Sequence, residues 1–573
     1  MLYSQVIMHI FREDFIQMNI PKLRELFNKD NIDGYIIPHN DEYQNEYVPE
    51  SNNRLKFISG FTGSNGIAIV TKDNKFFWTD GRYILQAKKE VPDFVTASRD
   101  FKEVGKARIG YNPILFTKSQ LDTLSKDLTM VAISQDLIDQ IWTSKPKILK
   151  SKAYLYPVKY SGMKAEEKLE IVRDNIKNSA DYALITEPDS ICWLLNIRGS
   201  DIEHVPLVLG YMIVGLEEVY LFTDLEKFSE EIQKEFGFIK FKNLPELFDI
   251  LALIKNKILI DPTSCPVALS DLCINKAYGK NPCLTPKACK NDTEIKYAIE
   301  GHIKDAIALC EGLSWVYKTK GITEHDVSIK LTELRSKQEG YVTDSFPTIA
   351  GFRENGAVIH YRAPENGSKI IDGDGILLID SGAHYLGCTT DVTRTIVWGT
   401  PSSEQKKRYT QVLKGHIALS SSIFPKGTLG GSLDIKARQY LWEDGENYTH
   451  GTGHGVGSML SVHEYPRYIW SLQAQTELKE GMIVSNEPGF YKEGEFGIRI
   501  ENLIYVERSS YPSFLKFETL TLVPYARDLI DIEMLTKQEK EFLRSYYSRI
   551  KKLILPSLSD DARIWCEYEM GIL

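Results

Sequence analysis

A strand-like run that ends in an acid constrains the fold of this chain more than any other feature. Gly375 to Gly382 holds four consecutive apolar residues followed by Asp380, and Asp391 opens the next such run, Val392 to Val397, eleven residues later. A buried carboxylate must be paired or must bind a metal. We therefore predict two neighbouring strands, joined through Gly387, that set both carboxylates side by side. The alternative is that each aspartate only caps a turn.

The histidines gather in the same part of the chain. Six of the eleven lie between residues 360 and 463, namely His360, His384, His416, His450, His454 and His463. The segment His450 to Gly457 places two histidines four residues apart among glycines, which let the backbone approach closely. It is not a dinucleotide loop, because Val456 stands at the third glycine position, and it lacks the Lys-Ser/Thr ending of a P-loop. His463 and Glu464 do not open the zincin motif His-Glu-x-x-His, because Arg467 stands at the second histidine position.

Two further strand-like runs, Met482 to Gly489 and Phe496 to Asn502, each present a glutamate, Glu487 and Glu501. By the alternation of side chains along a strand, Arg499 shares a face with Glu501. Alone, either glutamate would be read as a surface residue. Their position shortly after the acid and histidine motifs makes a shared site the better interpretation.

Convergence of these four carboxylates predicts bound metal ions. If they lie within about 4 Å of one another, each like-charge contact costs roughly 4 kcal/mol at an effective dielectric constant of about 20. Two divalent cations would cancel the four charges. Four carboxylates with one imidazole suit Mn²⁺, Co²⁺, Fe²⁺ or Zn²⁺. Such a pair of ions makes a bridging hydroxide at neutral pH and polarises a carbonyl, so we expect hydrolysis.

The rest of the chain divides into alternating strands and helices. We predict an α/β unit over 1–158, a second α/β unit over 159–286 and a larger unit over 287–573 with a C-terminal extension. The first two units have similar length and pattern, which suggests a duplicated domain. Asn291 and Glu294 have the spacing of a capping box ahead of a helix to about Lys318. The predicted N-terminal strands are 34–38, 66–70, 75–79, 182–185, 210–214, 219–222 and 257–262.

Charge and composition exclude several classes of protein. The 69 basic and 78 acidic residues give a net charge of −9, which argues against a general nucleic-acid binder. The longest apolar stretch, Val205 to Leu216, is about 12 residues, short of the roughly 20 that span a bilayer. Met1 to Phe11 lacks the basic start of a secretory signal. We therefore expect a cytoplasmic protein that binds neither nucleic acid nor membrane.

At these motifs the chain resembles the pita-bread metallopeptidases of family M24. Within that family it most resembles the three-domain Xaa-Pro aminopeptidases (aminopeptidase P), since residues 57–64, 78–83 and 355–361 also match their pattern. The five motif contexts are Asp380 in Asp-Ser-Gly, Asp391 in Thr-Asp-Val-Thr-Arg-Thr, His454 in His-Gly-Thr-Gly-His-Gly, Glu487 in Asn-Glu-Pro-Gly and Glu501 in Arg-Ile-Glu-Asn.

This resemblance implies a fold, an activity and a cofactor. The fold would be α/β and α+β, with two creatinase-N-like α/β domains followed by a C-terminal pita-bread catalytic domain. The activity would be hydrolysis of the N-terminal Xaa-Pro bond of peptides, with two divalent metal ions as cofactors, Mn²⁺ first and Co²⁺ or Zn²⁺ as alternatives. Partners would be peptide substrates with proline at the second position, and the protein would form a homodimer.

The resemblance also implies a role for each site residue. Asp380 would bind one metal, His454 and Glu487 the other, and Asp391 and Glu501 would bridge both, with Glu487 also the general base. Four further residues would have catalytic or substrate-binding roles without being predicted ligands. His360 would steady the scissile peptide and pass a proton to the leaving nitrogen, and His463 would hydrogen-bond the oxyanion. His450 would form part of the pocket wall, and Arg499 would orient Glu501 or another acid near the site. His384 and His416 lack a motif and are interpreted as structural.

Two alternatives remain beside this interpretation. A prolidase cleaves only Xaa-Pro dipeptides but usually has one N-terminal domain, whereas this chain has two α/β units before residue 291. A non-catalytic pita-bread module that binds peptide or protein partners is the alternative from a different class. The intact set of five ligand positions favours the enzyme.

Overall fold

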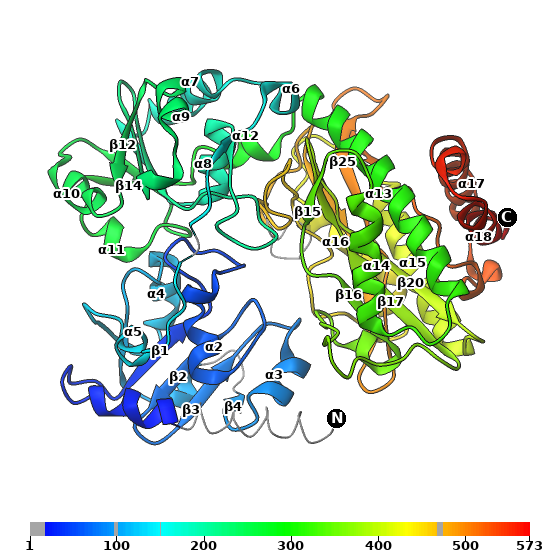
Figure 1. Cartoon of the computed structure of the whole chain (residues 1–573), viewed down its shortest axis with the longest axis horizontal. Helices are drawn as coiled ribbons and strands as arrows, with labels where there is room; N and C mark the ends of the chain where they lie inside the picture. Colours follow the sequence, from blue (N-terminus) through cyan, green and yellow to red (C-terminus); the bar gives the residue numbers. More distant parts are fainter. Residues whose placement is uncertain (1–17, 97–100, 149, 467–473, 573) are drawn as a thin grey trace. The chain divides into compact units, whose positions relative to one another are not determined.

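The computed structural model describes residues 18–96, 101–148, 150–466 and 474–572 (Figure 1). Within these residues the chain forms two compact units. The first runs to Tyr156 and resumes over Met163–Leu284, and the second contains Pro157–Gly162 and continues from Thr285. The segment Met1 to Phe11 lies outside the described residues. The prediction that this segment is not a secretory signal therefore stays a prediction. No helix in the described ranges is both long and apolar enough to cross a membrane.

The first unit contains two six-stranded sheets, and the first of them includes the predicted strands 34–38, 66–70 and 75–79. Its strand order is β4-β3-β2-β1-β5-β6. β2 pairs antiparallel with both β1 and β3, while the outer pairs are parallel. The helix α3 (Ile84–Glu90) follows β3 in the chain. The strands are β1 (Gly34–Pro38), β2 (Ile67–Thr71), β3 (Lys75–Trp78), β4 (Val95–Thr96), β5 (Arg108–Tyr111) and β6 (Thr129–Ala132).

The second sheet repeats the plan of the first. Its strand order is β12-β11-β10-β8-β13-β14, and β10 pairs antiparallel with both neighbours while the outer pairs are parallel. Strand by strand, this is the same succession of parallel and antiparallel pairs, as the predicted duplication requires. The strands are β8 (Tyr182–Ile185), β10 (Tyr211–Gly215), β11 (Val219–Thr223), β12 (Ile239–Asn243), β13 (Ile258–Ile260) and β14 (Lys276–Tyr278).

The second unit opens with the predicted capped helix. In α13 (Asp292–Lys318) the Asn291 side chain accepts hydrogen bonds from the first turn, and the Glu294 carboxylate accepts one from the Asn291 amide. α13 packs against α14 (Glu324–Ser336), and α15 (Ser403–Ser420) packs against α16 (Gly431–Trp442) (Figure 1). The C-terminal helices α17 (Lys537–Leu553) and α18 (Asp560–Met570) contribute buried residues to the same hydrophobic core. The C-terminal extension is therefore part of this unit.

Three antiparallel strands carry the first predicted acids. β17 (Gly375–Ser381) lies between β16 (Ile349–Phe352) and β20 (Val392–Trp398), and every residue of β17 is buried. The register places Asp380 opposite Thr393 and Ser381 opposite Val392. The predicted pairing of these two strands is confirmed.

The strand predicted over 496–502 is interrupted, and the interruption has a physical cause. β24 (Phe496–Arg499) pairs with β23 (Gly489–Lys492), whereas β25 (Asn502–Arg508) pairs with β22 (Ile483–Asn486). Between them the Ile500 amide donates to the Pro488 carbonyl and the Glu501 amide donates to the Thr393 carbonyl. The chain thus leaves one sheet and enters another at the two residues 500 and 501.

Candidate metal centre

The first cluster of carboxylates comes from the paired strands β17 and β20 and from the interruption after β24. Asp380 is the next-to-last residue of β17, Asp391 directly precedes β20, and Glu501 follows Ile500. One oxygen atom from each of these three side chains lies within 4.8 Å of the other two. All three residues are at least nine-tenths buried. The structure therefore places Asp380 and Asp391 side by side, as predicted.

A second cluster adjoins the first and shares Glu501 with it. Ligand atoms of His454, Glu487 and Glu501 also lie within 4.8 Å of one another. His454 Nε2 is 3.4 Å from Glu487 Oε1 and 3.5 Å from Asp391 Oδ2. The other ring nitrogen, Nδ1, is 3.0 Å from the Gly455 carbonyl and donates to it, which turns Nε2 toward the carboxylates. All five predicted ligand positions thus meet at one place.

The cluster carries an electrostatic conflict. Burial raises the pKa of Asp391 well above its usual range, and the charges of Asp380 and Glu487 raise it further. Burial, with the charge of Asp391 next, raises the pKa of Glu501 in the same way. Asp380 Oδ1 and Glu501 Oε1 are buried and have no hydrogen-bond donor. Buried polar atoms without partners and crowded acids are costly, and divalent cations would relieve both conditions. The oxygen-rich donor set with one imidazole fits such ions.

Arg499 is buried against these acids. Its Nη2 donates to Asp380 Oδ2 at 2.6 Å, and its Nε donates to Thr393 Oγ1 at 3.2 Å. The Thr393 hydroxyl in turn donates to Glu501 Oε2 at 2.8 Å. From the sequence, Arg499 is expected to orient Glu501 or another acid near the site. The guanidinium contacts Asp380 directly and reaches Glu501 through Thr393.

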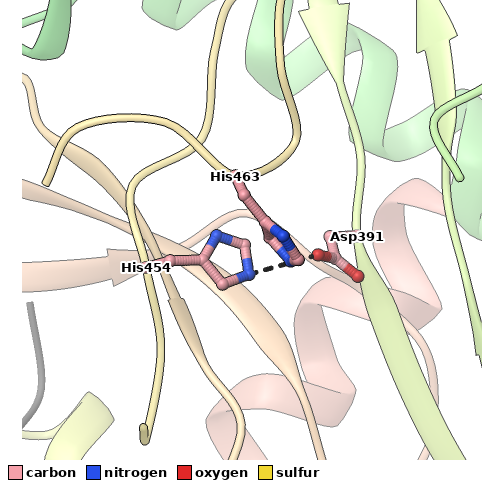
Figure 2. Close-up of side chains that lie close together, drawn as sticks. All are labelled: Asp391, His454 and His463. Carbon is pink, nitrogen blue, oxygen red and sulfur yellow. Dashed lines mark ion pairs between the residues drawn. The ribbon is translucent and has the colours of Figure 1, made fainter. Parts of the chain in front are cut away.

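His463 lies at the metal centre itself, beside two of the predicted ligands. Ligand atoms of Asp391, His454 and His463 lie within 4.8 Å of one another. The two imidazole rings stand edge to face, with centroids 4.2 Å apart and an angle of 73° between their planes. Figure 2 shows both rings directed toward the Asp391 carboxylate from separate stretches of loop. His463 therefore faces the same space as the predicted ligands.

His450 reaches the centre through other side chains. Its Nδ1 donates to the Gly451 carbonyl at 2.7 Å, so its Nε2 accepts from the Tyr491 hydroxyl at 2.9 Å. Arg499 Nη1 donates to the same hydroxyl at 2.8 Å. A chain of hydrogen bonds therefore runs from His450 through Tyr491 and Arg499 to Asp380.

His360 lies next to a residue that Arg499 holds. Arg499 Nη2 donates to the Ile359 carbonyl at 3.3 Å. Among the described residues, His360 belongs to none of the groups able to hold a metal. The role of His360 at the scissile peptide and the leaving nitrogen stays a prediction.

The two histidines without a motif are buried in the unit's interior. Burial, with Arg394 next, lowers the pKa of His416 to about 3. Its Nδ1 donates to the Asn486 carbonyl at 3.1 Å, so Nε2 accepts from the Tyr525 hydroxyl at 3.2 Å. His384 Nδ1 lies 3.1 Å from the Thr389 hydroxyl. Neither belongs to a metal-capable group of described residues.

Three site residues were not predicted from the sequence. Thr393 and Tyr491 form the bonds given above, and the Ser485 hydroxyl accepts from the His454 amide at 3.0 Å and donates to Glu487 Oε1 at 3.2 Å. Thr393 lies two residues after Asp391 and Ser485 two residues before Glu487. Alternation along a strand, applied outward from each predicted ligand, would have identified both.

Sequence families match almost the whole chain in order. Residues 19–141 and 144–294 each match a Creatinase/Prolidase N-terminal domain family. Residues 297–508 match Metallopeptidase family M24, and residues 513–570 match the C-terminal region of peptidase M24.

Curated relatives are similar along nearly their full length. Aminopeptidase P2 of Arabidopsis thaliana is 36% identical over 95% of this chain and 86% of its own. Xaa-Pro aminopeptidase 1 of Dictyostelium discoideum is 38% identical over 94% of this chain and 93% of its own.

Solved structures give the same relationship. The crystal structure of the X-prolyl aminopeptidase from Caenorhabditis elegans, described as a cytosolic enzyme with a di-nuclear active site, has a TM-score of 0.91 and 32% identity. It covers 97% of this chain and 99% of that one. The prolidase from Pyrococcus horikoshii has a TM-score of 0.51 and 26% identity and covers 63% of this chain and 99% of its own. From these matches and the convergent acids and histidines, the chain belongs to metallopeptidase family M24 and, within it, to the Xaa-Pro aminopeptidase P family.

Proposed function

We propose that this protein is a metal-dependent aminopeptidase that hydrolyses the N-terminal Xaa-Pro bond of peptides. The observation that carries the proposal is the meeting of Asp380, Asp391, His454, Glu487 and Glu501 around two unpartnered buried carboxylate oxygens. The substrate class comes from the relatives named Xaa-Pro or X-prolyl aminopeptidase, which match 94% and 97% of this chain.

The ligand assignment follows the two clusters. Asp380, Asp391 and Glu501 would hold one divalent ion, and His454, Glu487 and Glu501 the other, with Asp391 close enough to His454 to serve both. We propose Mn²⁺ as the ion, with Co²⁺ or Zn²⁺ as alternatives, because the donors are mostly oxygens. When bound, the two ions acidify a water molecule and polarise the scissile carbonyl.

The chain's own residues divide the proton transfers. Glu487, whose Oε1 accepts from Ser485, takes a proton from the attacking water as general base. His463 donates a hydrogen bond to the carbonyl oxygen as negative charge develops there. His360 steadies the peptide and passes a proton to the departing proline nitrogen, and His450 forms part of the pocket wall. Arg499 holds Asp380 in place and takes part in substrate binding.

Proline at the second position explains the need for a dedicated enzyme. The Xaa-Pro bond has no N–H, and the proline ring restricts the residue before it. An aminopeptidase that binds its substrates through that N–H would bind these peptides poorly.

The protein's organisation supports the aminopeptidase over the prolidase. The prolidase match covers 63% of this chain, whereas the aminopeptidase match covers 97% and includes both N-terminal sheets. We propose boundaries at 1–158, 159–286 and 287–573, a homodimer and a cytoplasmic location. The last is supported by the description of the Caenorhabditis elegans protein as cytosolic. A non-catalytic binding module is disfavoured, because such a protein would have no need of a costly cluster of buried acids.

Substrate comparison tests the proposal. With Mn²⁺ present, kcat/KM for Arg-Pro-Pro should exceed that for the dipeptide Gly-Pro, and Arg-Ala-Pro should be cleaved poorly. A strong preference for Gly-Pro would instead identify a prolidase, and no cleavage of any of the three peptides would contradict the proposed reaction.

A further inference from the structure

A buried carboxylate outside the metal centre holds the segment that carries His360. Glu324, the first residue of α14, is fully buried. Its Oε1 accepts from the Phe352 amide at 2.7 Å and from Asn355 Nδ2 at 2.9 Å. Its Oε2 accepts from the Tyr361 hydroxyl at 2.8 Å. The donors are a backbone amide, an amide side chain and a phenol, none of them charged.

All three donors belong to one short stretch, residues 352–361. Phe352 ends β16 and directly precedes the 3-10 turn η4 (Arg353–Ala357), Asn355 lies within that turn, and Tyr361 follows His360. Asn355 Nδ2 also donates to the Tyr361 hydroxyl at 3.0 Å. One buried carboxylate therefore joins the start of the stretch to its end.

The same stretch is held from the opposite side by the metal-centre residue Arg499. Its Nη2 donates both to the Ile359 carbonyl and to Asp380 Oδ2. The turn also lies directly on β24, since a Cβ at Gly497 would come 1.8 Å from the Gly356 carbonyl oxygen. His360 thus stands between a neighbour that Arg499 holds and a neighbour that Glu324 holds.

We propose that Glu324 is a positioning residue that sets His360 for its work on the leaving group, while making no contact with the substrate itself. This inference rests on the proposed function. Glu324 acts through the backbone of residues 352–361 and through the Tyr361 hydroxyl. Because His360 meets the departing nitrogen in the transition state, misplacing it lowers kcat more than it raises KM.

A double-mutant cycle tests this coupling. The proteins compared are the wild type, E324Q, H360A and E324Q/H360A, each loaded with Mn²⁺ and assayed for kcat and KM on Arg-Pro-Pro. E333Q is the matched control, because Glu333 lies on the same helix but is exposed and forms salt bridges with Lys330 and Lys337.

Glu324→Gln should lower kcat about tenfold, because the amide N–H must then face a donor where a carboxylate oxygen accepts from the Phe352 amide or the Tyr361 hydroxyl. H360A should lower kcat by about a hundredfold or more, the range of a general acid. The double variant should match H360A within about twofold, because the two changes act on one event. E333Q should match the wild type, and metal content should be equal in all five proteins.

Several results would overturn the inference. They are a kcat for E324Q equal to that of the wild type, losses that multiply in the double variant, or an H360A enzyme as active as the wild type. If the wild type and E333Q cleave no Xaa-Pro peptide, the proposed function fails, which is distinct from a failure of the coupling alone. Should E324Q not fold, Y361F removes one of the three donors and must show the same non-additivity with H360A.

Discussion

Glu487 and Glu501 occupy opposite sides of one break in a long antiparallel hairpin. β22 and β25 pair up to Asn486 and Asn502, and β23 and β24 resume the pairing at Gly489 and Arg499. The two residues between these pairings on each arm include one glutamate each; there the Ile500 amide still donates to the Pro488 carbonyl, while the Glu501 amide donates to the Thr393 carbonyl of β20. Ligand atoms of both glutamates lie within 4.8 Å of each other and of a His454 ring nitrogen, and an oxygen of Glu501 lies equally close to one of Asp391.

Neutralising Glu487 should stop catalysis and leave the fold intact. E487Q keeps the size of the side chain and removes the base, so kcat should fall by about a thousandfold, within the range for general bases. Kinetics on Arg-Pro-Pro and a thermal denaturation curve check this. E495Q is the control, since Glu495 lies on the turn of the same hairpin and pairs with Lys492 at 3.0 Å. A near-normal kcat for E487Q would refute its role as the base.

Glu464 should be important for stability because it forms salt bridges with two buried lysines. Its carboxylate lies 3.2 Å from Lys287 Nζ and 3.0 Å from Lys290 Nζ, and all three side chains are at most 1% exposed. E464Q removes the shared charge, and breaking a buried ion pair typically costs about 3–5 kcal/mol in the free energy of unfolding.

Urea denaturation of E464Q measures this cost. The control is E480Q, which removes an exposed pair with Arg508 and should change the free energy of unfolding by at most about 1 kcal/mol. Equal denaturation midpoints for E464Q and E480Q would contradict the buried ion-pair account.

Glu569 should make stability depend on pH. Burial raises its pKa to about 7, and the Arg527 amide donates to it at 2.7 Å. Between its usual pKa and this value the folded protein binds a proton that the unfolded chain has lost. The free energy of unfolding therefore falls as the pH rises through that window.

The variant E569Q removes this titration. At pH 4 and below it should be nearly as stable as the wild type, and at pH 8 it should be more stable by on the order of 3 kcal/mol. Denaturation at the two pH values checks the sign. The same difference between the two proteins at both pH values would show that Glu569 does not titrate in this way.

The sequence was enough to predict most of the local structure and five of the six residues in the metal-capable clusters as ligands, with His463 predicted beside them at the oxyanion. Short apolar runs bounded by turn residues predicted strands such as β1 and β8, and the pair Asn291 and Glu294 predicted the start of α13. These signals are local, because the apolar pattern of a strand and the cap of a helix are formed by residues within a few positions of one another. The candidate ligands could be identified because glycine-rich or apolar motifs surround each of them.

The features that could not be predicted depend on contacts between segments that lie far apart in the sequence. The partner of Arg499 could not be predicted, since Asp380 lies 119 residues away in the chain. The split at Ile500 and Glu501 could not be predicted either, because alternation says which residues share a face but not which strand pairs with them. Glu324 resembles any first-turn glutamate in the sequence, and its role emerges only from its bonds to Phe352 and Tyr361.

The central claim is that hydrolysis requires two metal ions per chain. Measuring activity as a function of the metal bound per chain tests this claim most directly. Protein stripped with a chelator, and shown to be metal-free by elemental analysis, should not cleave Arg-Pro-Pro. Addition of Mn²⁺ should restore activity and saturate at about two ions per chain, the number that balances four carboxylates. Full activity in the verified metal-free protein would contradict the account.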